Sequence, residues 1–249
     1  MLFSKNSVLA LAAFAVGQAV ATSIPHRHFH TKRAANEAVE LPTKRNLLTT
    51  DAASILTTLG VKSAGINAAA PNGAVWLGPG GPYTNEFINN STATIIAVVW
   101  GSWGSWVNAQ QPLITVSLAP GQTQVVSFAN GQSGGWAGIY PDTKLVNGQI
   151  SETWGEYTFS NPWSTFDVSR EVNMKGHVMS IEAPNCVSNF DKCVFVCDDA
   201  SATSCITGYS LKNCATGSQP GAGAGTYAGA ASGGCTGLGE SAALKTYFL

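Results

Sequence analysis

The sequence contains little charge and no excess of basic residues. Charged side chains make up 11% of its 249 residues, with 13 Lys and Arg against 14 Asp and Glu. After residue 45 the balance is acidic, because seven basic residues face twelve acidic ones and the net charge is −5. A nucleic-acid-binding surface needs a basic footprint, and anionic lipids attract basic segments. The composition therefore argues against nucleic acid and membrane surfaces as partners.

The sequence also lacks an apolar run of the roughly 20 residues that cross a bilayer. A shorter apolar stretch, residues 8–16, follows Lys5 and precedes the small residues Ala19 and Ala21. This order is typical of a secretory signal peptide. We therefore predict an exported, extracellular protein with a signal peptide over residues 1–21 that is cleaved after Ala21.

Two dibasic pairs, Lys32-Arg33 and Lys44-Arg45, follow the predicted signal peptide. Exposed segments of this kind are open to proteolysis, and secretory-pathway proteases cut at Lys-Arg pairs. We predict a propeptide over residues 22–45, with processing after Arg33 or Arg45; a basic linker that stays uncut is the alternative. Three of the four histidines lie in this segment and would leave with it. We accordingly expect no metal site and no cofactor.

Cysteine is absent before residue 186, whereas all seven tryptophans lie between Trp76 and Trp163. An even number of cysteines in an exported chain implies disulfides, here three. The residues involved are Cys186, Cys193, Cys197, Cys205, Cys214 and Cys235. Six cysteines allow 15 pairings, and the sequence does not choose among them. A zinc site with Cys193 and Cys197 is disfavoured because no second close pair follows.

Short alternating segments predict β-structure. Residues 114–118 (ITVSL) alternate with the period of a half-buried strand, and residues 123–128 (TQVVSF) form a second strand. Pro120 and Gly121 between them are typical of a type II turn, so we predict a hairpin. Further strands are predicted over residues 94–100, 153–159 and 178–181. A helix is predicted over residues 51–59, capped by Thr50 or Asp51 and ended by Gly60.

Many short strands with Gly and Pro turns predict an all-β fold, a β-sandwich or a barrel. We choose a β-sandwich over residues 75–184, preceded by the helix and a linker over residues 46–74. The disulfide-rich, loop-rich residues 185–249 are expected to belong to the same domain. They contain few large apolar side chains, so we expect cross-links to hold them.

Residues 131–135 (GQSGG) fit the pattern of a serine nucleophile elbow. That motif works only at a strand–turn–helix corner, with a histidine and an acid later in the chain. The following residues lack a helical pattern, and His177 is the only histidine after residue 45. We therefore interpret the segment as a Gly-rich turn between strands.

Three carboxylates in the Trp-rich stretch, Glu152, Glu156 and Asp167, are the candidates for chemistry. On a strand, Glu152, Trp154 and Glu156 would share one face, placing an aromatic ring between two acids as in sugar-binding clefts. Two carboxylates across a cleft can hydrolyse a glycoside. The alternatives are carboxylates that face solvent, or one buried acid paired with Arg170.

The stretch VVWGSWGSWVN, residues 98–108, places three tryptophans three residues apart. We expect Trp100 to end a buried strand, and Trp103 and Trp106 to lie in the loop beyond it. Exposed indoles bind sugar faces or partner proteins, which makes both rings candidate binding residues. The alternative is that all three pack in the core. Overlapping glycosylation acceptors at Asn89 and Asn90 predict one surface sugar near a turn.

Several motifs together resemble a family of secreted fungal proteins typified by the Aspergillus major allergen number four. They are VVW (98–100), LAPGQT (118–123), Ser127-Phe128, Trp136, WGEYTF (154–159), Trp163 and DVS (167–169). The likeness spans about residues 75–249. It implies an extracellular effector-like protein without an established enzymatic activity, and it supplies no catalytic residues.

A weaker resemblance is to thaumatin-like proteins, through GEYTF (155–159), FDVS (166–169) and NMKGHVM (173–179). It implies a thaumatin-like β-sandwich in which Glu156 and Asp167 line an acidic cleft associated with β-glucan binding. The chain departs from that family in having six cysteines rather than many and no matching early arginine motif.

We therefore predict a secreted, monomeric effector or allergen-like protein that binds cell wall glucan or a host extracellular protein and is not an enzyme. One rival is a glucan-active hydrolase that uses Glu156 and Asp167. The other is a structural cell wall protein.

Overall fold

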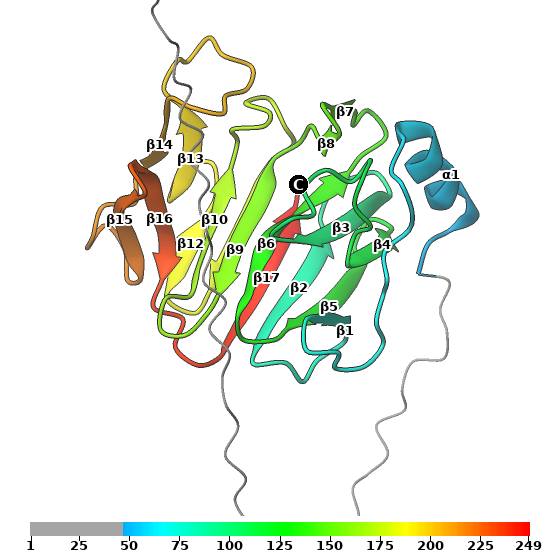
Figure 1. Cartoon of the computed structure of the whole chain (residues 1–249), viewed down its shortest axis with the longest axis horizontal. Helices are drawn as coiled ribbons and strands as arrows, with labels where there is room; N and C mark the ends of the chain where they lie inside the picture. Colours follow the sequence, from blue (N-terminus) through cyan, green and yellow to red (C-terminus); the bar gives the residue numbers. More distant parts are fainter. Residues whose placement is uncertain (1–46) are drawn as a thin grey trace, which may run out of the picture. The chain divides into compact units, whose positions relative to one another are not determined.

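Two β-sheets pack face to face in the computed structural model, which describes residues 47–249 (Figure 1). The six-stranded sheet contains, in order, β1 (Val75–Leu77), β5 (Thr123–Phe128), β2 (Tyr83–Asn89), β17 (Ala242–Phe248), β11 (Met179–Ala183) and β12 (Cys186–Ser188). The nine-stranded sheet contains β14 (Tyr209–Lys212), β13 (Val194–Cys197), β10 (Thr165–Ser169), β9 (Trp154–Phe159), β6 (Gln132–Ile139), β3 (Ile95–Gly101) and β4 (Ile114–Leu118), with the hairpin β15 (Ala222–Tyr227)–β16 (Ala230–Thr236) joined to β10. The short strands β7 (Leu145–Val146) and β8 (Gln149–Ile150) pair separately. The predicted all-β sandwich is confirmed.

Aromatic side chains fill the space between the sheets. Phe87 on β2 meets Trp136 on β6 edge-on at 5.7 Å between ring centroids, and Phe128 meets Phe159 at 5.1 Å. Phe248 of β17 stacks on Phe87 at 5.9 Å. Burial of each such ring contributes about 1.5–3 kcal/mol. Because β17 lies beside β2 and runs parallel to it, the core is built from both ends of the described chain.

Strand β3 is buried on both of its faces. Val99 faces the core between the sheets, whereas Ile96 and Val98 belong to a second apolar cluster on the outer face of the nine-stranded sheet. Ala52 and Leu56 of helix α1 (Thr50–Leu59) complete that cluster, and Figure 1 shows α1 beside β3 and β4. Burial on two faces explains the continuous run of β-branched residues in this strand.

Helix α1 begins one residue before the predicted start. Thr49, rather than Thr50 or Asp51, is the N-cap, and its side chain accepts a hydrogen bond from the backbone N–H of Ala52. Gly60 ends the helix in the left-handed conformation, with φ 81°. Within residues 47–249 no helix is long and apolar enough to cross a membrane.

The predicted hairpin over residues 114–128 is wrong. Both strands and the turn exist, and the N–H of Gln122 donates to the carbonyl of Ala119 at 2.9 Å. However, β4 pairs with β3 in one sheet, and β5 pairs with β1 and β2 in the other. The turn therefore connects the two sheets, because alternation specifies which face is buried and not which strand is the partner. The GQSGG segment also differs from the prediction, since residues 132–135 form the first half of β6.

Three disulfides join all six cysteines. The pairs are Cys186–Cys235, Cys193–Cys214 and Cys197–Cys205. The first bond connects β12 of one sheet to β16 of the other, and the other two hold the loops around β13 and β14. Cys193 and Cys197 belong to different disulfides, which removes the zinc alternative.

Candidate functional site

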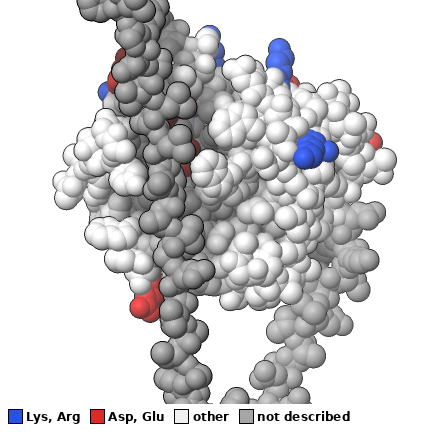
Figure 2. All heavy atoms as spheres, in the orientation of Figure 1, with Lys and Arg blue, Asp and Glu red and all other residues white. Residues whose placement is uncertain are grey.

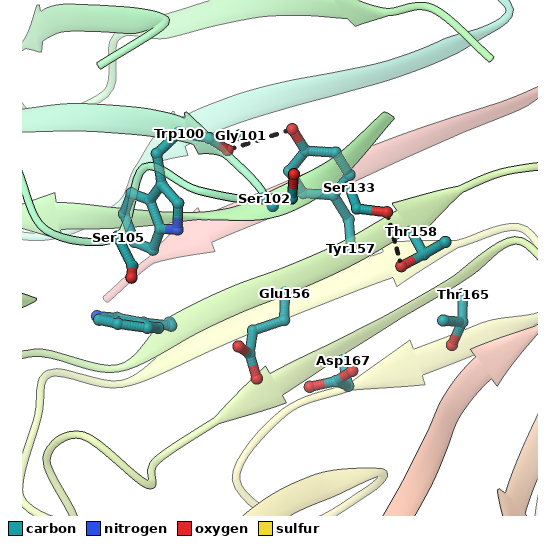
Figure 3. Close-up of a pocket in the computed structure, with 12 residues that line it drawn as sticks. Trp100, Gly101, Ser102, Ser105, Ser133, Glu156, Tyr157, Thr158, Thr165 and Asp167 are labelled. Carbon is teal, nitrogen blue, oxygen red and sulfur yellow. Dashed lines mark hydrogen bonds between the residues drawn. The ribbon is translucent and has the colours of Figure 1, made fainter. Parts of the chain in front are cut away.

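A cleft of about 320 Å³ opens on the outer face of the nine-stranded sheet, next to the apolar cluster under α1. Figure 3 shows the two carboxylates of Glu156 and Asp167 side by side in it. The lining residues are Trp100, Gly101, Ser102, Ser105, Ser133, Gly134, Trp154, Glu156, Tyr157, Thr158, Thr165 and Asp167. The cleft thus combines two acids, two indoles and several hydroxyl groups.

Strand register brings the two acids together. Glu156 of β9 lies directly opposite Asp167 of β10 in an antiparallel pair, and residues opposite each other point to the same face. Their chain neighbours Tyr157, Phe166 and Val168 point into the core. The alternation of polar and apolar residues in both strands therefore places the acids on the outer face.

Glycine at position 135 makes room for one wall of the cleft. Gly135 of β6 lies opposite both Trp100 and Glu156. A Cβ atom at Gly135 would be 2.8 Å from the Trp100 indole, so any larger residue would displace the ring. Trp100 in turn packs edge-on against Trp154, with 4.9 Å between ring centroids. The two indoles form an apolar wall beside the acids.

Burial and mutual repulsion raise the pKa values of the carboxyl groups. For Asp167, burial is the main cause, followed by the charges of Glu156 and Glu171, and its pKa lies well above the usual range. Burial likewise raises the pKa of Glu156, partly offset by a hydrogen bond from Ser169. Glu171, just beyond β10, has a pKa raised to about 8 by burial and by Glu156. Three acids, Glu156 and Asp167 in the cleft lining and Glu171 beyond it, therefore influence one another's pKa values.

The pairing of a cleft acid with Arg170 does not occur. The Arg170 guanidinium donates to the carbonyl of Met174 and lies 4.1 Å above the ring of Phe190. The ion pairs within residues 47–249 involve His177, Lys212 and Lys245, and none includes a cleft acid. Lys and Arg are also sparse on the face that Figure 2 shows.

The tryptophans separate as the sequence indicated. Trp100 is buried at the end of β3, whereas Trp103 and Trp106 in the following loop are 83% and 49% exposed. The loop lines the cleft with Ser102 and Ser105, and its two exposed indoles lie outside the lining. Of the candidate binding residues, the structure brings Trp154, Glu156 and Asp167 into one cleft.

Glu152 does not share a face with Trp154 and Glu156. Strand β9 begins only at Trp154, so the two-residue period does not reach back to position 152. The Glu152 carboxylate is buried and accepts hydrogen bonds from the Thr143 hydroxyl at 2.7 Å and from the backbone N–H of His177 at 2.9 Å. Its Oε2 is also 3.1 Å from Nδ1 of His177, whose ring stacks on Tyr140 at 3.7 Å. Glu152 therefore belongs to a separate, structural cluster.

The two glycosylation acceptors differ in access. Asn89 is fully buried, and its side-chain amide donates to the carbonyls of Ala93 and Leu118. Asn90 is exposed, so it is the acceptor that a glycosylating enzyme can reach. The predicted processing sites at Ala21, Arg33 and Arg45 lie outside the described residues.

Sequence reasoning missed several cleft residues. Thr165, two residues before Asp167, lines the cleft, and Ser169 and Glu171 continue the same spacing of two beyond the lining; this spacing is the signal that could have identified one polar face of β10 and its extension. Ser133 and Thr158 are joined by a hydrogen bond of 3.1 Å across β6 and β9. These two could not have been paired before the strand partners were known.

Comparisons with known proteins identify the family. A profile of the Allergen Asp f 4-like domain matches residues 81–228, more than half of the chain, and no curated protein sequence matches. Among solved structures, the protein elicitor MoHrip2 from Magnaporthe oryzae is 13% identical, covers 67% of this chain and 98% of its own, and has a TM-score of 0.35. The thaumatin-like xylanase inhibitor TLXI is 11% identical, covers 66% and 97%, and has a TM-score of 0.37. By the profile match, the chain belongs to the Allergen Asp f 4-like domain family.

Proposed function

We propose that this protein acts outside the cell as an effector-like binding protein and that its cleft binds a cell wall polysaccharide. The cleft carries the proposal, because it combines an indole wall formed by Trp100 and Trp154 with carboxylates and hydroxyls at its base. Aromatic surfaces pack against sugar faces, and precisely placed polar groups fix a ligand's orientation. Three disulfides fit an oxidising, extracellular location.

The open form of the cleft suits a polymer. It lies across neighbouring strands β3, β6, β9 and β10 of one sheet rather than in a closed cavity. Hydroxyl groups from β6, β9 and β10 and from the loop after β3 line the cleft, so one sugar unit can be held from several sides. Trp103, exposed on the same loop as Ser102 and Ser105, offers a further ring for an extended chain.

A second candidate function is glycoside hydrolysis by Glu156 and Asp167. The observation in its favour is that two acids opposite each other have raised pKa values, so one can hold a proton while the other is ionised. A hydrolase would release reducing sugar from a soluble glucan, and Glu156→Gln would abolish that release. A binding protein releases none.

The binding proposal is tested by filling the cleft. Ser102 is exposed and lines the cleft, so Ser102→Trp places a large ring there without disturbing the core. We expect mature protein to be retained on insoluble wall polysaccharide, and Ser102→Trp to weaken retention at least about tenfold, as for loss of a central contact. Ser218→Trp, at an exposed position outside the lining, is the matched control. Retention that is absent from the wild type, or equal in both variants, would refute the proposal.

A further inference from the structure

Glu156 and Asp167 in the cleft and the neighbouring Glu171 take part in none of the ion pairs among residues 47–249. Asp167 is 6% exposed, and its Oδ1 atom makes no hydrogen bond although it is buried. Figure 3 shows its carboxylate beside that of Glu156. Buried carboxylates are ordinarily paired with a cation, because an unpaired charge in a low-dielectric site is costly. An acid that stays buried without a partner therefore points to a positive group supplied from outside.

Glu156, Asp167 and Glu171 do not form a three-ligand metal site. Within residues 47–249 the sets of potential ligand atoms that lie within 4.8 Å of one another are Cys186–Cys193–Cys235 and Asp142–Glu152–His177. Glu156, Asp167 and Glu171 are not among these sets, so the oxygen atoms of all three do not converge on a single point. Glu156 and Asp167 lie opposite each other on β9 and β10, and Glu171 lies four residues after Asp167 and outside the cleft lining. This spread suits a ligand with positive groups at intervals.

The remaining lining favours a saccharide over a basic peptide. Ser102, Ser133, Thr158 and Thr165 present hydroxyl groups, which can exchange hydrogen bonds with sugar hydroxyls. Trp100 and Trp154 line the cleft beside Glu156 with the small exposed part of their indoles, 4% and 6%. A cation next to such a ring is also attracted to its face. A positively charged sugar uses all three features together.

We propose that the cleft selects a polysaccharide that carries protonated amino groups, namely a glucosamine polymer such as chitosan. This inference rests on the proposed function, since it names the class of polysaccharide that the same cleft binds. Glu156, Asp167 and Glu171 would pair with the ammonium groups, and the hydroxyls and indoles would hold the sugar rings. Tyr209, whose pKa is raised by burial and by the charges of Glu171 and Glu156, and Tyr157, which lines the cleft and whose pKa is raised by burial, are further titratable groups near the acids.

Calorimetry with matched oligomers tests the inference. The wild-type mature protein is titrated with chitosan oligomers, with fully N-acetylated oligomers of the same length, with neutral β-glucan oligomers and with oligolysine. At about pH 5, where the amino groups of glucosamine are protonated, we expect the chitosan form to bind at least about tenfold more tightly than the acetylated form. We also expect its affinity to fall with added salt. Because a bound cation lowers the raised pKa values of the acids, binding should release protons.

Charge-neutral variants identify the groups involved. Glu156→Gln and Glu171→Gln should each weaken chitosan binding by about three- to tenfold, and should weaken binding of the acetylated form by a smaller factor. Glu182→Gln, an exposed acid on β11 outside the cleft, is the control and should have no effect. Thermal melting of each variant confirms that it is folded.

The outcomes separate this inference from the proposed function. Equal affinity for chitosan and its acetylated form would overturn the inference and leave polysaccharide binding intact. Tight binding of oligolysine without any saccharide binding would overturn both, in favour of a basic peptide. An affinity for chitosan that neither glutamine variant changes would also overturn the inference, because the amines would then bind elsewhere.

Discussion

Glu152 and Glu156 are four residues apart and lie in opposite kinds of environment. Glu152 is buried with three donors around it, from Thr143 and from the backbone and ring of His177. Glu156 is near Asp167 and Glu171, two further acids, and takes part in no ion pair of the described chain. The Glu152 carboxylate is hydrogen-bonded by its neighbours, whereas Glu156 lies among carboxylates that repel one another.

The difference separates an acid that is held by hydrogen bonds within the fold from acids that we propose to bind a ligand. A buried acceptor that is fully hydrogen-bonded stabilises the fold, because removing it leaves buried donors unsatisfied. Acids with raised pKa values in a cleft reduce stability whenever they ionise, and groups of this kind gather at functional sites. The hydrogen bonds around Glu152 therefore stabilise the folded chain, whereas ionisation of the acids at the cleft destabilises it.

The largest expected effect on stability comes from removing the hydrogen-bonded carboxylate of Glu152. Glu152→Ala should lower the free energy of unfolding by about 2–4 kcal/mol, because three donors lose their acceptor and a small cavity forms. Glu152→Gln, which keeps the acceptor facing Thr143, should lose less. Urea denaturation of both variants measures the effect. A loss below about 0.5 kcal/mol in the alanine variant would mean that the cluster is not structural.

Glu171→Gln is expected to increase the stability of the folded protein, unlike Glu152→Ala. The pKa of Glu171 rises from 4.5 in the unfolded chain to about 8 in the fold, so between these values the unfolded state binds fewer protons. The wild type therefore loses stability as the pH rises through this window. Solvent screening of this partly exposed group leaves an effect on the order of 1 kcal/mol, and the variant should melt about 2–4 °C higher at pH 8. The melting temperatures of the wild type and the variant should converge below about pH 4.5. A variant that melts at a lower temperature than the wild type at pH 8 would contradict the claim that ionised Glu171 destabilises the fold.

An exposed ion pair should show the smallest effect. Lys245 on β17 lies opposite Glu86 on β2, with 3.8 Å between the ammonium and the carboxylate. The Lys245 side chain is half exposed, so solvent screens the pair. Lys245→Ala should cost less than about 1 kcal/mol, and added salt should diminish the difference. A larger, salt-independent loss in urea denaturation would show that the packing of the lysine stem, not its charge, is what matters.

Local sequence patterns predicted where most strands and the helix lie, but not which strands pair with each other. Alternation located β4 and β5 at the predicted residues, and Gly60 ended the helix as expected. The hairpin between β4 and β5 failed because a type II turn can equally join strands of two different sheets. Similarly, the two-residue period placed Trp154 and Glu156 on one face, but it was extended two residues too far, to Glu152.

The cleft was predictable only in part. Glu156 and Asp167 were identified from their sequence context, and the family inferred from the motifs was confirmed. Glu171 was missed, because its importance depends on the charge of Glu156 from another strand. The sequence left open whether Trp103 is exposed or packs in the core, and the structure shows that it is exposed and lies outside the cleft lining.

The sequence by itself determined the all-β class, the faces of the strands and the presence of three disulfides, because side-chain alternation and cysteine number are local properties. Only the tertiary structure decided which strands pair, which cysteines join and which acids meet. Those outcomes depend on contacts between residues distant in the chain, such as Asp167 opposite Glu156 and Cys186 bonded to Cys235. The energy of a buried carboxylate is set by such neighbours, so Glu152 and Glu156 differ in role although they are the same residue type.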